Sequence, residues 1–253
     1  MSGHESVVRS FSGVASNYVT SSGHAHAGVL ERFVGLLEPK GHERALDVAT
    51  GAGHVALTLA PLVAEVIAYD VTIAMLEVTA DSAAARGITN LQTKQGPAER
   101  IPFPDGAFDI VTSRLGAHHF TDIGLALEEM RRVLAKGGKL AIEDTCSPDD
   151  SASDEALDRI ERLRDPSHGR NYRVAEWRAM LDSAGFHVLS EETGYFGDGT
   201  AMEIDGWMDR IRTPVENRPL VWEAFEGAPS ALKETLRYDG RAFQIPILTV
   251  LAE

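Results

Sequence analysis

Residues 44–60, RALDVATGAGHVALTLA, decide the fold of this chain. An apolar run that carries a single acid, Asp47, meets the turn Gly51-Ala52-Gly53, and a helical pattern follows. Glycine suits such a turn because it tolerates unusual backbone dihedrals and lets a ligand approach the main chain closely. A helix that begins there points unpaired N–H groups toward the bound molecule. The segment therefore predicts a strand, a ligand-binding turn and a helix.

Apolar runs and helical patterns alternate on both sides of this segment. Strands that are continuously apolar and separated by helices predict a parallel sheet covered on both faces. Their connections should be right-handed crossovers. We expect helices over residues 26–37, 72–87 and from 122 to the Gly137-Gly138 pair, and strands over residues 66–70, 91–96, 108–113 and 140–144.

The regular alternation loosens beyond Ser147. Pro246 cannot donate to a ladder, so it belongs at a strand start, a bulge or an edge. The whole pattern predicts an α/β fold, with a doubly wound, mostly parallel seven-stranded sheet and a helical cap. In this part we expect an acidic loop over residues 148–154, helices over 155–164 and 177–184, a strand over 186–190, short proline-broken helices over 203–238 and a last strand over 245–251.

One domain accounts for the whole chain in this interpretation. Phe11 and Tyr18 stand alone among serine, glycine and histidine near the amino terminus. Two interpretations of that segment stay open: a frayed terminus, or a lid that orders over the ligand with both aromatic rings. The expected parts are an N-terminal lid over residues 1–25, a ligand-binding core over 26–146, cap elements around the sixth strand over 147–240, and the last strand over 241–253.

Composition limits the partners of the chain. Its 253 residues are 43% hydrophobic and 25% charged, which is ordinary for a globular protein. A formal net charge of −14 disfavours nucleic acids, which are held through phosphate contacts. The single cysteine, Cys146, excludes an internal disulfide and a cysteine-built zinc cage. No apolar run has membrane-spanning length and residues 1–5 lack the features of a signal peptide, so we expect a cytoplasmic protein whose partner is a small molecule.

The turn also satisfies the dinucleotide-binding pattern G-x-G-x-x-G/A over residues 51–56. Asp70 lies close to the spacing of the ribose-binding acid in that pattern. NAD and S-adenosylmethionine both present a ribose diol, so this match leaves both open. Asp47 separates them, because a carboxylate just before the turn repels a pyrophosphate and attracts an ammonium group. S-adenosylmethionine carries an ammonium and a sulfonium but no phosphate, so the charge favours it.

Four motifs in order resemble the class I S-adenosylmethionine-dependent methyltransferases. They are DVATGAGH at 47–54, Asp70 after the second expected strand, GPAERIPFPDGAFD at 96–109 and RRVLAKGG at 131–138. Downstream, SRLGAHHF at 113–120 and RDPSH at 164–168 are similar to a bacterial YcgJ-like subgroup, related to the UbiE/MenG-type quinone methyltransferases.

The resemblance implies S-adenosylmethionine as the cofactor. The sequence departs from the family at Pro97, where many relatives carry an acid that accepts from the adenine amino group. Adenine recognition must then rest on main-chain groups around Ala98, on Glu99 or on apolar walls. The cofactor-binding residues we expect are Tyr18, Asp47, Ala49, Gly51, Gly53, Asp70, Val71, Met75, Pro97, Ala98, Glu99 and Arg114.

The reaction that the resemblance implies is an in-line displacement, in which an acceptor nucleophile attacks the methyl carbon of the sulfonium. Positioning and exclusion of water supply much of the acceleration, and no metal is required. His118 and His119 follow the fourth expected strand, and an imidazole with a pKa near 6.5 suits a base. Alternatively, one contacts the cofactor or packs under the next helix while the other is solvated. Asp144 is a second candidate base, with turn capping as its other role.

The cap offers candidate acceptor contacts in His168, Arg170 and Tyr172, which alternatively are loop residues that pair with the acidic surface. Two other functions stay open at this stage: an NAD-dependent oxidoreductase, and a protein that binds S-adenosylmethionine without transferring its methyl group. The sequence leaves the acceptor, the methylated atom and the oligomeric state undecided.

Overall fold

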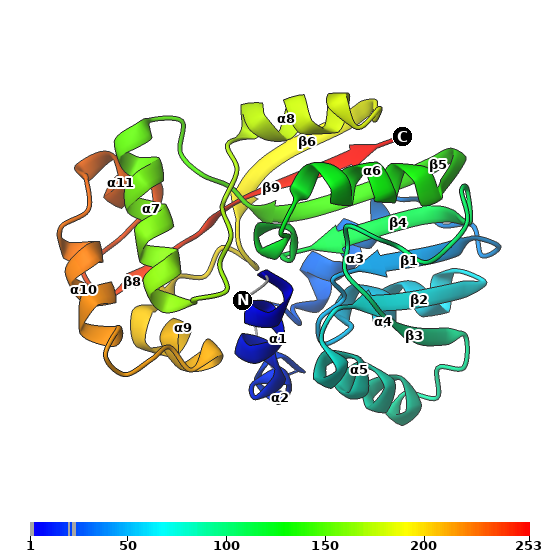
Figure 1. Ribbon diagram of the computed structural model, residues 1–253, viewed down its shortest axis with the longest axis horizontal. Coiled ribbons are helices and arrows are strands. Elements are labelled where there is room, and N and C mark those ends of the chain that lie inside the picture. Colours follow the sequence, from blue (N-terminus) through cyan, green and yellow to red (C-terminus); the bar gives the residue numbers. More distant parts are fainter. Residues whose placement is uncertain (1–2, 20, 22–23) are drawn as a thin grey trace.

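The computed structural model describes residues 3–19, 21 and 24–253 and centres on a seven-stranded sheet (Figure 1). The strands lie in the order β3-β2-β1-β4-β5-β9-β6, and of these seven β9 alone runs antiparallel to the other six. This arrangement confirms the predicted doubly wound, mostly parallel sheet. The bounds are β1 Arg44–Val48, β2 Glu65–Asp70, β3 Leu91–Gln95, β4 Phe108–Arg114, β5 Leu134–Thr145, β6 Val188–Tyr195 and β9 Pro246–Ala252.

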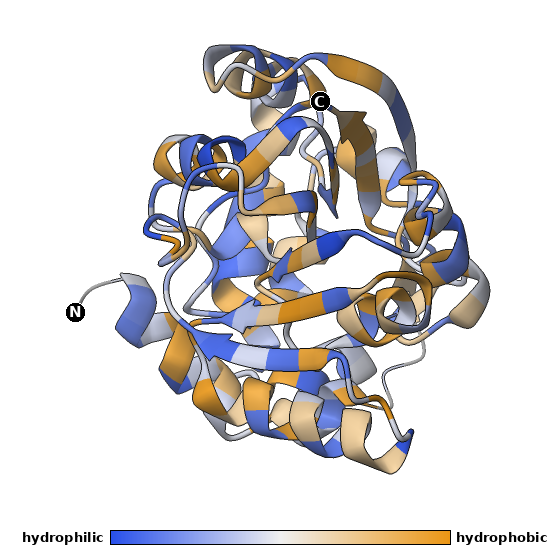
Figure 2. Ribbon diagram, turned by 90° about the vertical axis from the view of Figure 1, so that its right-hand side faces the viewer, coloured by the Kyte–Doolittle hydropathy of each residue, from blue (hydrophilic) through white to orange (hydrophobic). Residues whose placement is uncertain are grey.

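Helices cover both faces of the sheet with their apolar sides. α6 and α8 bury residues such as Met130 and Trp177 against one face, and α3 and α4 bury residues such as Phe33 and Val55 against the other. Figure 2 shows hydrophobic residues concentrated in the strands that these helices enclose. The bounds are α3 Ala27–Gly35, α4 His54–Leu59, η1 Ala60–Leu62, α5 Ile73–Ala85, η2 Ala117–His119, α6 Ile123–Val133 and α8 Val174–Ser183.

A second core forms a cap beyond the carboxyl ends of the parallel strands (Figure 1). Aromatic contacts hold it together: the Phe243 ring centroid lies 4.9 Å from that of Trp207 and 4.8 Å from that of Phe225. The cap elements are α7 Ser151–Arg164, β7 Met202–Glu203, α9 Ile204–Ile211, α10 Arg218–Glu226, α11 Ser230–Thr235 and β8 Ala242–Phe243.

The N-terminal segment forms two helices, α1 Gly3–Ser12 and α2 Ala15–Val19, between the sheet and the cap (Figure 1). Asn17 Nδ2 donates to the Arg210 carbonyl of the cap at 3.1 Å, and His54 Nε2 lies 2.9 Å from the Tyr18 carbonyl oxygen. The described part of this segment therefore bridges the core and the cap. Residues 1, 2, 20, 22 and 23 of the predicted lid lie outside the described residues.

Several boundaries in the core differ from the prediction, most clearly where α6 gives way to β5 and at the end of β6. α6 ends at Val133 rather than at the glycine pair, because Leu134 already pairs with Phe108 as the first residue of β5. Gly137, with φ of +77°, lies in the irregular stretch of the ladder that follows. β6 runs to Tyr195 because its pairing with β9 continues that far.

Two boundaries in the cap also differ. Asp150 accepts a hydrogen bond from Ser153 N at 2.9 Å, so part of the predicted acidic loop is the capped first turn of α7. Pro219 lies in the first turn of α10, where proline is tolerated, rather than between helices. Pro246 opens β9, as predicted.

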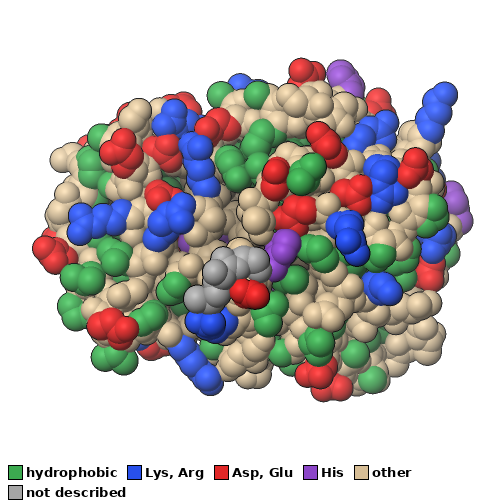
Figure 3. All heavy atoms as spheres, viewed as in Figure 1, with side chains coloured by type: hydrophobic (Ala, Val, Ile, Leu, Met, Phe, Trp, Pro, Cys, Tyr) green, Lys and Arg blue, Asp and Glu red, His purple; other side chains and the backbone are tan. Residues whose placement is uncertain are grey.

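Two further observations concern the distribution of charge on the surface and the hydrophobicity of the helices. On the face shown in Figure 3, Lys and Arg side chains are interspersed with Asp and Glu rather than gathered in one patch. Among the described residues, no helix has both the length and the apolar character needed to cross a membrane.

Candidate functional site

Two adjoining pockets lie at the carboxyl edge of the parallel strands. The first has a volume of about 970 Å³ with its open mouth included, and residues of α1 and α2 form part of its wall. The fold brings most of the predicted cofactor-binding residues together there. Its walls include Tyr18, Asp47, Ala49, Gly51, Asp70, Val71, Met75, Pro97, Ala98, Glu99 and Arg114.

The glycine turn presents its backbone to the first pocket. Ala49, Gly51 and Gly53 have φ angles of +55°, +54° and +81°, a region that favours glycine. Gly53 is not among the residues that line the pocket. It packs closely on α5 instead, since a Cβ on Gly53 would come within 2.5 Å of Thr79 Cγ2. The Thr79 hydroxyl donates to the Gly51 carbonyl at 2.9 Å. Gly53 thus acts through the packing of the turn on α5.

Asp47 is held under the turn by two hydroxyl groups. Its carboxylate accepts from Thr50 Oγ1 at 2.6 Å and from Thr112 Oγ1 at 2.7 Å, and its residue is 1% exposed. Burial raises the pKa of Asp47 to about 6, although the two hydroxyls oppose that shift. A cation bound beside the ionised Asp47 carboxylate would therefore offset the free-energy cost of burying that charge.

Asp70 links the glycine turn after β1 to the segment after β2, and both line the first pocket. Its Oδ2 accepts from Gly51 N at 2.9 Å, and its Oδ1 accepts from Thr72 N at 2.8 Å. Burial raises the pKa of this carboxyl group too. Each oxygen can accept a further hydrogen bond, so the group can hold a diol while it fixes the turn.

The loop after β3 is fixed by Tyr69 and Glu99. A Cβ on Gly96 would lie 2.0 Å from Tyr69 Oη, and that hydroxyl donates to the Pro97 carbonyl at 3.0 Å. Glu99 accepts from Thr121 N at 2.7 Å, and its other oxygen lies 2.9 Å from His4 Nε2 of α1. Glu99 therefore ties the pocket to the N-terminal segment.

Arg114, which lines the first pocket, carries an unsatisfied donor. Its Nε donates to Glu143 Oε1 at 2.7 Å in a buried ion pair, and its Nη1 donates to the His24 carbonyl at 3.2 Å. Its Nη2 is buried and has no hydrogen-bond partner among the described residues. An unpaired buried donor is costly unless a ligand satisfies it.

The second pocket has a volume of about 520 Å³, open solvent included, and lies between the first pocket and the cap. The two pockets share five residues, which are Phe11, Tyr18, His24, Leu115 and His119. The remaining walls are His118, Thr145, Glu161, Arg164, Phe196, Met202, Trp207, Arg210 and Ile245. The chain therefore offers space for two adjoining ligands.

His118 and Asp144 form a hydrogen-bonded pair at the second pocket. Nδ1 of His118 lies 2.5 Å from Asp144 Oδ1, and Nε2 has no hydrogen-bond partner among the described residues. Burial works to lower the pKa of His118, but the charge and hydrogen bond of Asp144 outweigh it and raise that pKa. For Asp144, burial works to raise the pKa, and His118 outweighs it and lowers that pKa. Asp144 can therefore hold the neutral His118 imidazole in the tautomer that carries its proton on Nδ1, which leaves Nε2 free to accept a proton.

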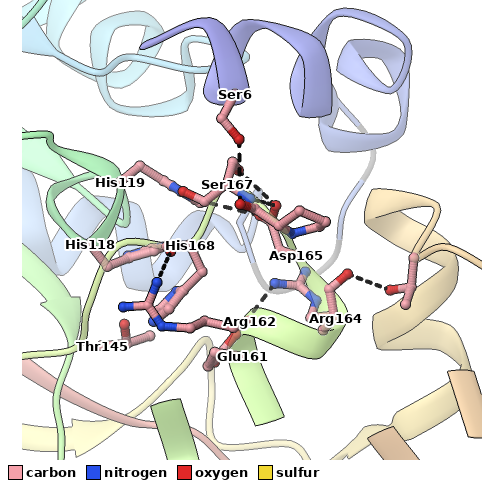
Figure 4. A network of polar contacts seen from close by, with 12 residues as sticks. Ser6, His118, His119, Thr145, Glu161, Arg162, Arg164, Asp165, Ser167 and His168 are labelled. Atoms are coloured by element: carbon pink, nitrogen blue, oxygen red, sulfur yellow. Dashed lines mark hydrogen bonds and ion pairs between the residues drawn. The ribbon is translucent and has the colours of Figure 1, made fainter. Parts of the chain in front are cut away.

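His119 lies beside His118 in a different environment. Its Nδ1 is 3.1 Å from the Ser167 carbonyl oxygen and its Nε2 is 3.9 Å from Asp165 Oδ2. Burial and the neighbouring His118 lower the pKa of His119 to about 4. Figure 4 shows both histidines beside the segment that follows α7, with Glu161 and Arg164 of α7 across from them. His119 is thus neutral near pH 7 and lines both pockets.

The predicted acceptor residues do not line either pocket. His168 is buried, and its ring centroid lies 5.6 Å from that of His118; burial lowers the pKa of His168 well below its usual range. Arg170 pairs with Glu176 at 2.8 Å. Tyr172 packs against Trp177 with their ring centroids 5.8 Å apart. His168, Arg170 and Tyr172 therefore lie outside the walls of both pockets.

Several pocket residues were not predicted from the sequence. Thr72 follows the second strand and could have been found from its place next to Asp70. His24, Glu161 and Arg210 lie in no motif, and Arg164 opens the RDPSH motif but was not expected at a site. Cys146 is buried, burial raises the pKa of its thiol to about 12, and it lies in neither pocket. No group of metal-binding side chains occurs within the described ranges.

Comparison with known proteins gives consistent matches. The methyltransferase domain family matches residues 46–142. The chain is 35% identical to the methyltransferase YcgJ of Bacillus subtilis over 225 residues, 89% of this chain and 87% of that protein. It is 41% identical to the ubiquinone/menaquinone biosynthesis C-methyltransferase UbiE of Zymomonas mobilis over 133 residues, 51% of this chain and 55% of that one. The crystal structure of YcgJ from Bacillus subtilis has a TM-score of 0.81 at 31% identity, over 90% of this chain and 98% of that chain.

Proposed function

The chain belongs to the class I S-adenosylmethionine-dependent methyltransferases, and we propose that it methylates a small-molecule acceptor bound in the second pocket. One observation carries the proposal: the second pocket adjoins the first through five shared residues and is lined by His118, whose Nε2 has no hydrogen-bond partner among the described residues. A methyl group presented between the two pockets would face an acceptor and a base together.

The residues of the first pocket fit S-adenosylmethionine, the cofactor of this family. The buried Asp47 carboxylate offers a counter-charge for the ammonium group, and the unpaired Arg114 Nη2 offers a donor for the carboxylate. Asp70 has acceptor capacity left for the ribose diol. Pro97 and Ala98 supply an apolar wall for the adenine ring.

The chemistry divides between the cofactor and the chain. Bound S-adenosylmethionine supplies an activated methyl group that an acceptor nucleophile takes by in-line displacement. His118 Nε2 takes the proton that an acidic acceptor must lose, and Asp144 holds the proton on Nδ1 so that Nε2 stays free. Phe11 and Tyr18 of the lid help to exclude water, since both line the two pockets. Alignment of the two ligands supplies much of the acceleration.

The proposal extends to partners and location. We infer that nucleic acids are not partners, which the net charge of −14 and the mixed charges in Figure 3 support. We also infer a cytoplasmic location, which a chain with a single cysteine fits.

A labelled-methyl assay tests the proposal. The purified chain is incubated with methyl-labelled S-adenosylmethionine and a panel of phenols, enols, thiols, amines and carboxylic acids, and label in small-molecule products is measured. We expect transfer to at least one member, lost in the Asp70→Ala variant. Saturable binding of S-adenosylmethionine with no product across the panel would favour a binding protein, and calorimetric binding of NAD in its place would favour an oxidoreductase.

Cofactor affinity is expected to fall in acid because of Asp47. Burial raises the pKa of Asp47 to about 6, so in the free protein the group gains a proton as the pH falls through that value. The ammonium group of the ligand needs the ionised form, so affinity should drop about tenfold between about pH 7 and about pH 5. Calorimetry with S-adenosylhomocysteine measures this. Asp47→Asn should bind more weakly throughout and lose this dependence; an unchanged slope would assign it to another group, such as Asp70.

A further inference from the structure

Two arginines of the cap line the second pocket, Arg164 at the end of α7 and Arg210 in α9. Burial raises the pKa of the Tyr18 phenol, which lines the same pocket, and the charges of Arg164 and Arg210 oppose that shift. The two arginines also repel each other as like charges. Two positive charges in a partly buried wall are costly unless an anion offsets them.

The carboxylates nearby compensate Arg164 but not Arg210. Glu161 Oε2 lies 3.7 Å from Arg164 Nη1, and Asp165 adds attraction to Arg164 from outside the pocket. Within the described residues, no carboxylate lies at ion-pair distance from the Arg210 guanidinium. Burial, followed by the charge of Arg164, lowers the pKa of Arg210, yet a guanidinium stays charged at neutral pH. In a chain with net charge −14, Arg210 is thus an uncompensated positive charge in the wall of the second pocket.

Apolar side chains from the cap surround the two arginines in the wall of the pocket. Phe196, Met202, Trp207 and Ile245 form its walls on the cap side. The Arg164 guanidinium stacks over the Trp207 ring, 4.4 Å from its centroid, which fixes the direction of the charged group. A ligand with an apolar body and one anionic group would match this distribution of walls and charge.

We propose that the acceptor is a small organic acid with an apolar body, whose anionic group binds Arg210 and Arg164 while its reactive atom lies near His118. The proposal rests on the proposed function, because it names the class of molecule that the second pocket takes. Carboxylates and ionised phenols or enols share the chemistry that these arginines recognise.

Binding measurements test the proposal without relying on turnover. The protein is saturated with S-adenosylhomocysteine, and matched pairs of aromatic and medium-chain carboxylic acids and their amides, with phenols and their methyl ethers, are titrated by ligand-observed NMR and by Trp fluorescence. We expect the acid of at least one pair to bind about tenfold to a hundredfold more tightly than its neutral partner, the factor that one charge-assisted hydrogen bond supplies. Whether acids or phenols show the larger factor distinguishes the two sources of the anion.

Variants assign the effect to the two arginines. Arg210→Gln should abolish the preference for the acid, Arg210→Lys should keep part of it, and Arg241→Gln, an exposed cap arginine, should leave it unchanged. Thermal melting confirms that each variant is folded. Equal binding of every acid and its neutral partner, or a preference that survives Arg210→Gln, would overturn the proposal. A clear acid preference without any methyl transfer would leave the anion site standing and refute the proposed function instead.

Discussion

Asp70→Ala is expected to weaken binding of S-adenosylmethionine by about a hundredfold or more. Two hydroxyl groups that donate to one carboxylate contribute about 1.5–3 kcal/mol each, so their joint loss corresponds to about 10²–10⁴ in affinity. Asp70 also accepts from the backbone N–H groups of Gly51 and Thr72, so its removal loosens the turn that faces the cofactor. Calorimetry with S-adenosylmethionine and with S-adenosylhomocysteine measures the change.

The diol contribution can be separated from the loosened turn. S-adenosylhomocysteine and its 2′,3′-dideoxy analogue are each titrated into the unsubstituted protein and into Asp70→Ala, which completes a thermodynamic cycle. The unsubstituted protein should strongly prefer the ligand that carries the diol, and the variant should bind both about equally. Asp81→Ala, on the exposed side of α5, serves as the control and should bind normally. A preference that persists in Asp70→Ala would mean that another group holds the ribose.

The first pocket could be predicted because most of the residues expected to bind the cofactor follow strand ends within a continuous stretch. Asp47, Asp70 and Arg114 each come at or near the end of a buried apolar strand, and parallel strands bring those ends to one edge. The apolar runs themselves predicted β1, β2 and β4, because each is buried on both faces of the sheet.

The second pocket could not be predicted in the same way. Its walls come from the N-terminal segment, the segment after β4, α7 and α9, and these meet only through the packing of the cap. Arg210 belongs to an amphipathic helix in which charged residues are ordinary, so its pattern gives no sign of a site. Arg164 opens the RDPSH motif, but that motif indicates only the subgroup and assigns no role to the residue. His168 and Arg170 show the opposite case, since they were expected at the acceptor and their side chains line neither pocket. Residues that only the tertiary packing of distant segments brings together share no local sequence pattern.

Asp144→Asn is expected to lower kcat by about 10²–10⁴, the range that general acid–base catalysis supplies, with little change in cofactor affinity. The asparagine amide keeps the shape of the side chain but removes the charge that holds the proton on Nδ1 of His118. His118→Gln should lower kcat by a similar factor, and the double variant should be no worse than either single one, since the two residues act as a unit. Initial rates with the acceptor found in the labelled-methyl assay measure this.

The pH profile gives a readout that a merely structural role would not change. His118 can accept a proton only when it is neutral, and Asp144 raises the pKa of His118, so kcat should rise with pH until it passes that raised value and then level off. In Asp144→Asn the opposing effect of burial dominates and lowers the pKa of His118, so the acid limb should move to lower pH while the plateau falls. Asp150→Asn, at the exposed N-cap of α7, is the matched control and should change neither. An acid limb that stays in place in Asp144→Asn would show that a group other than His118 takes the proton.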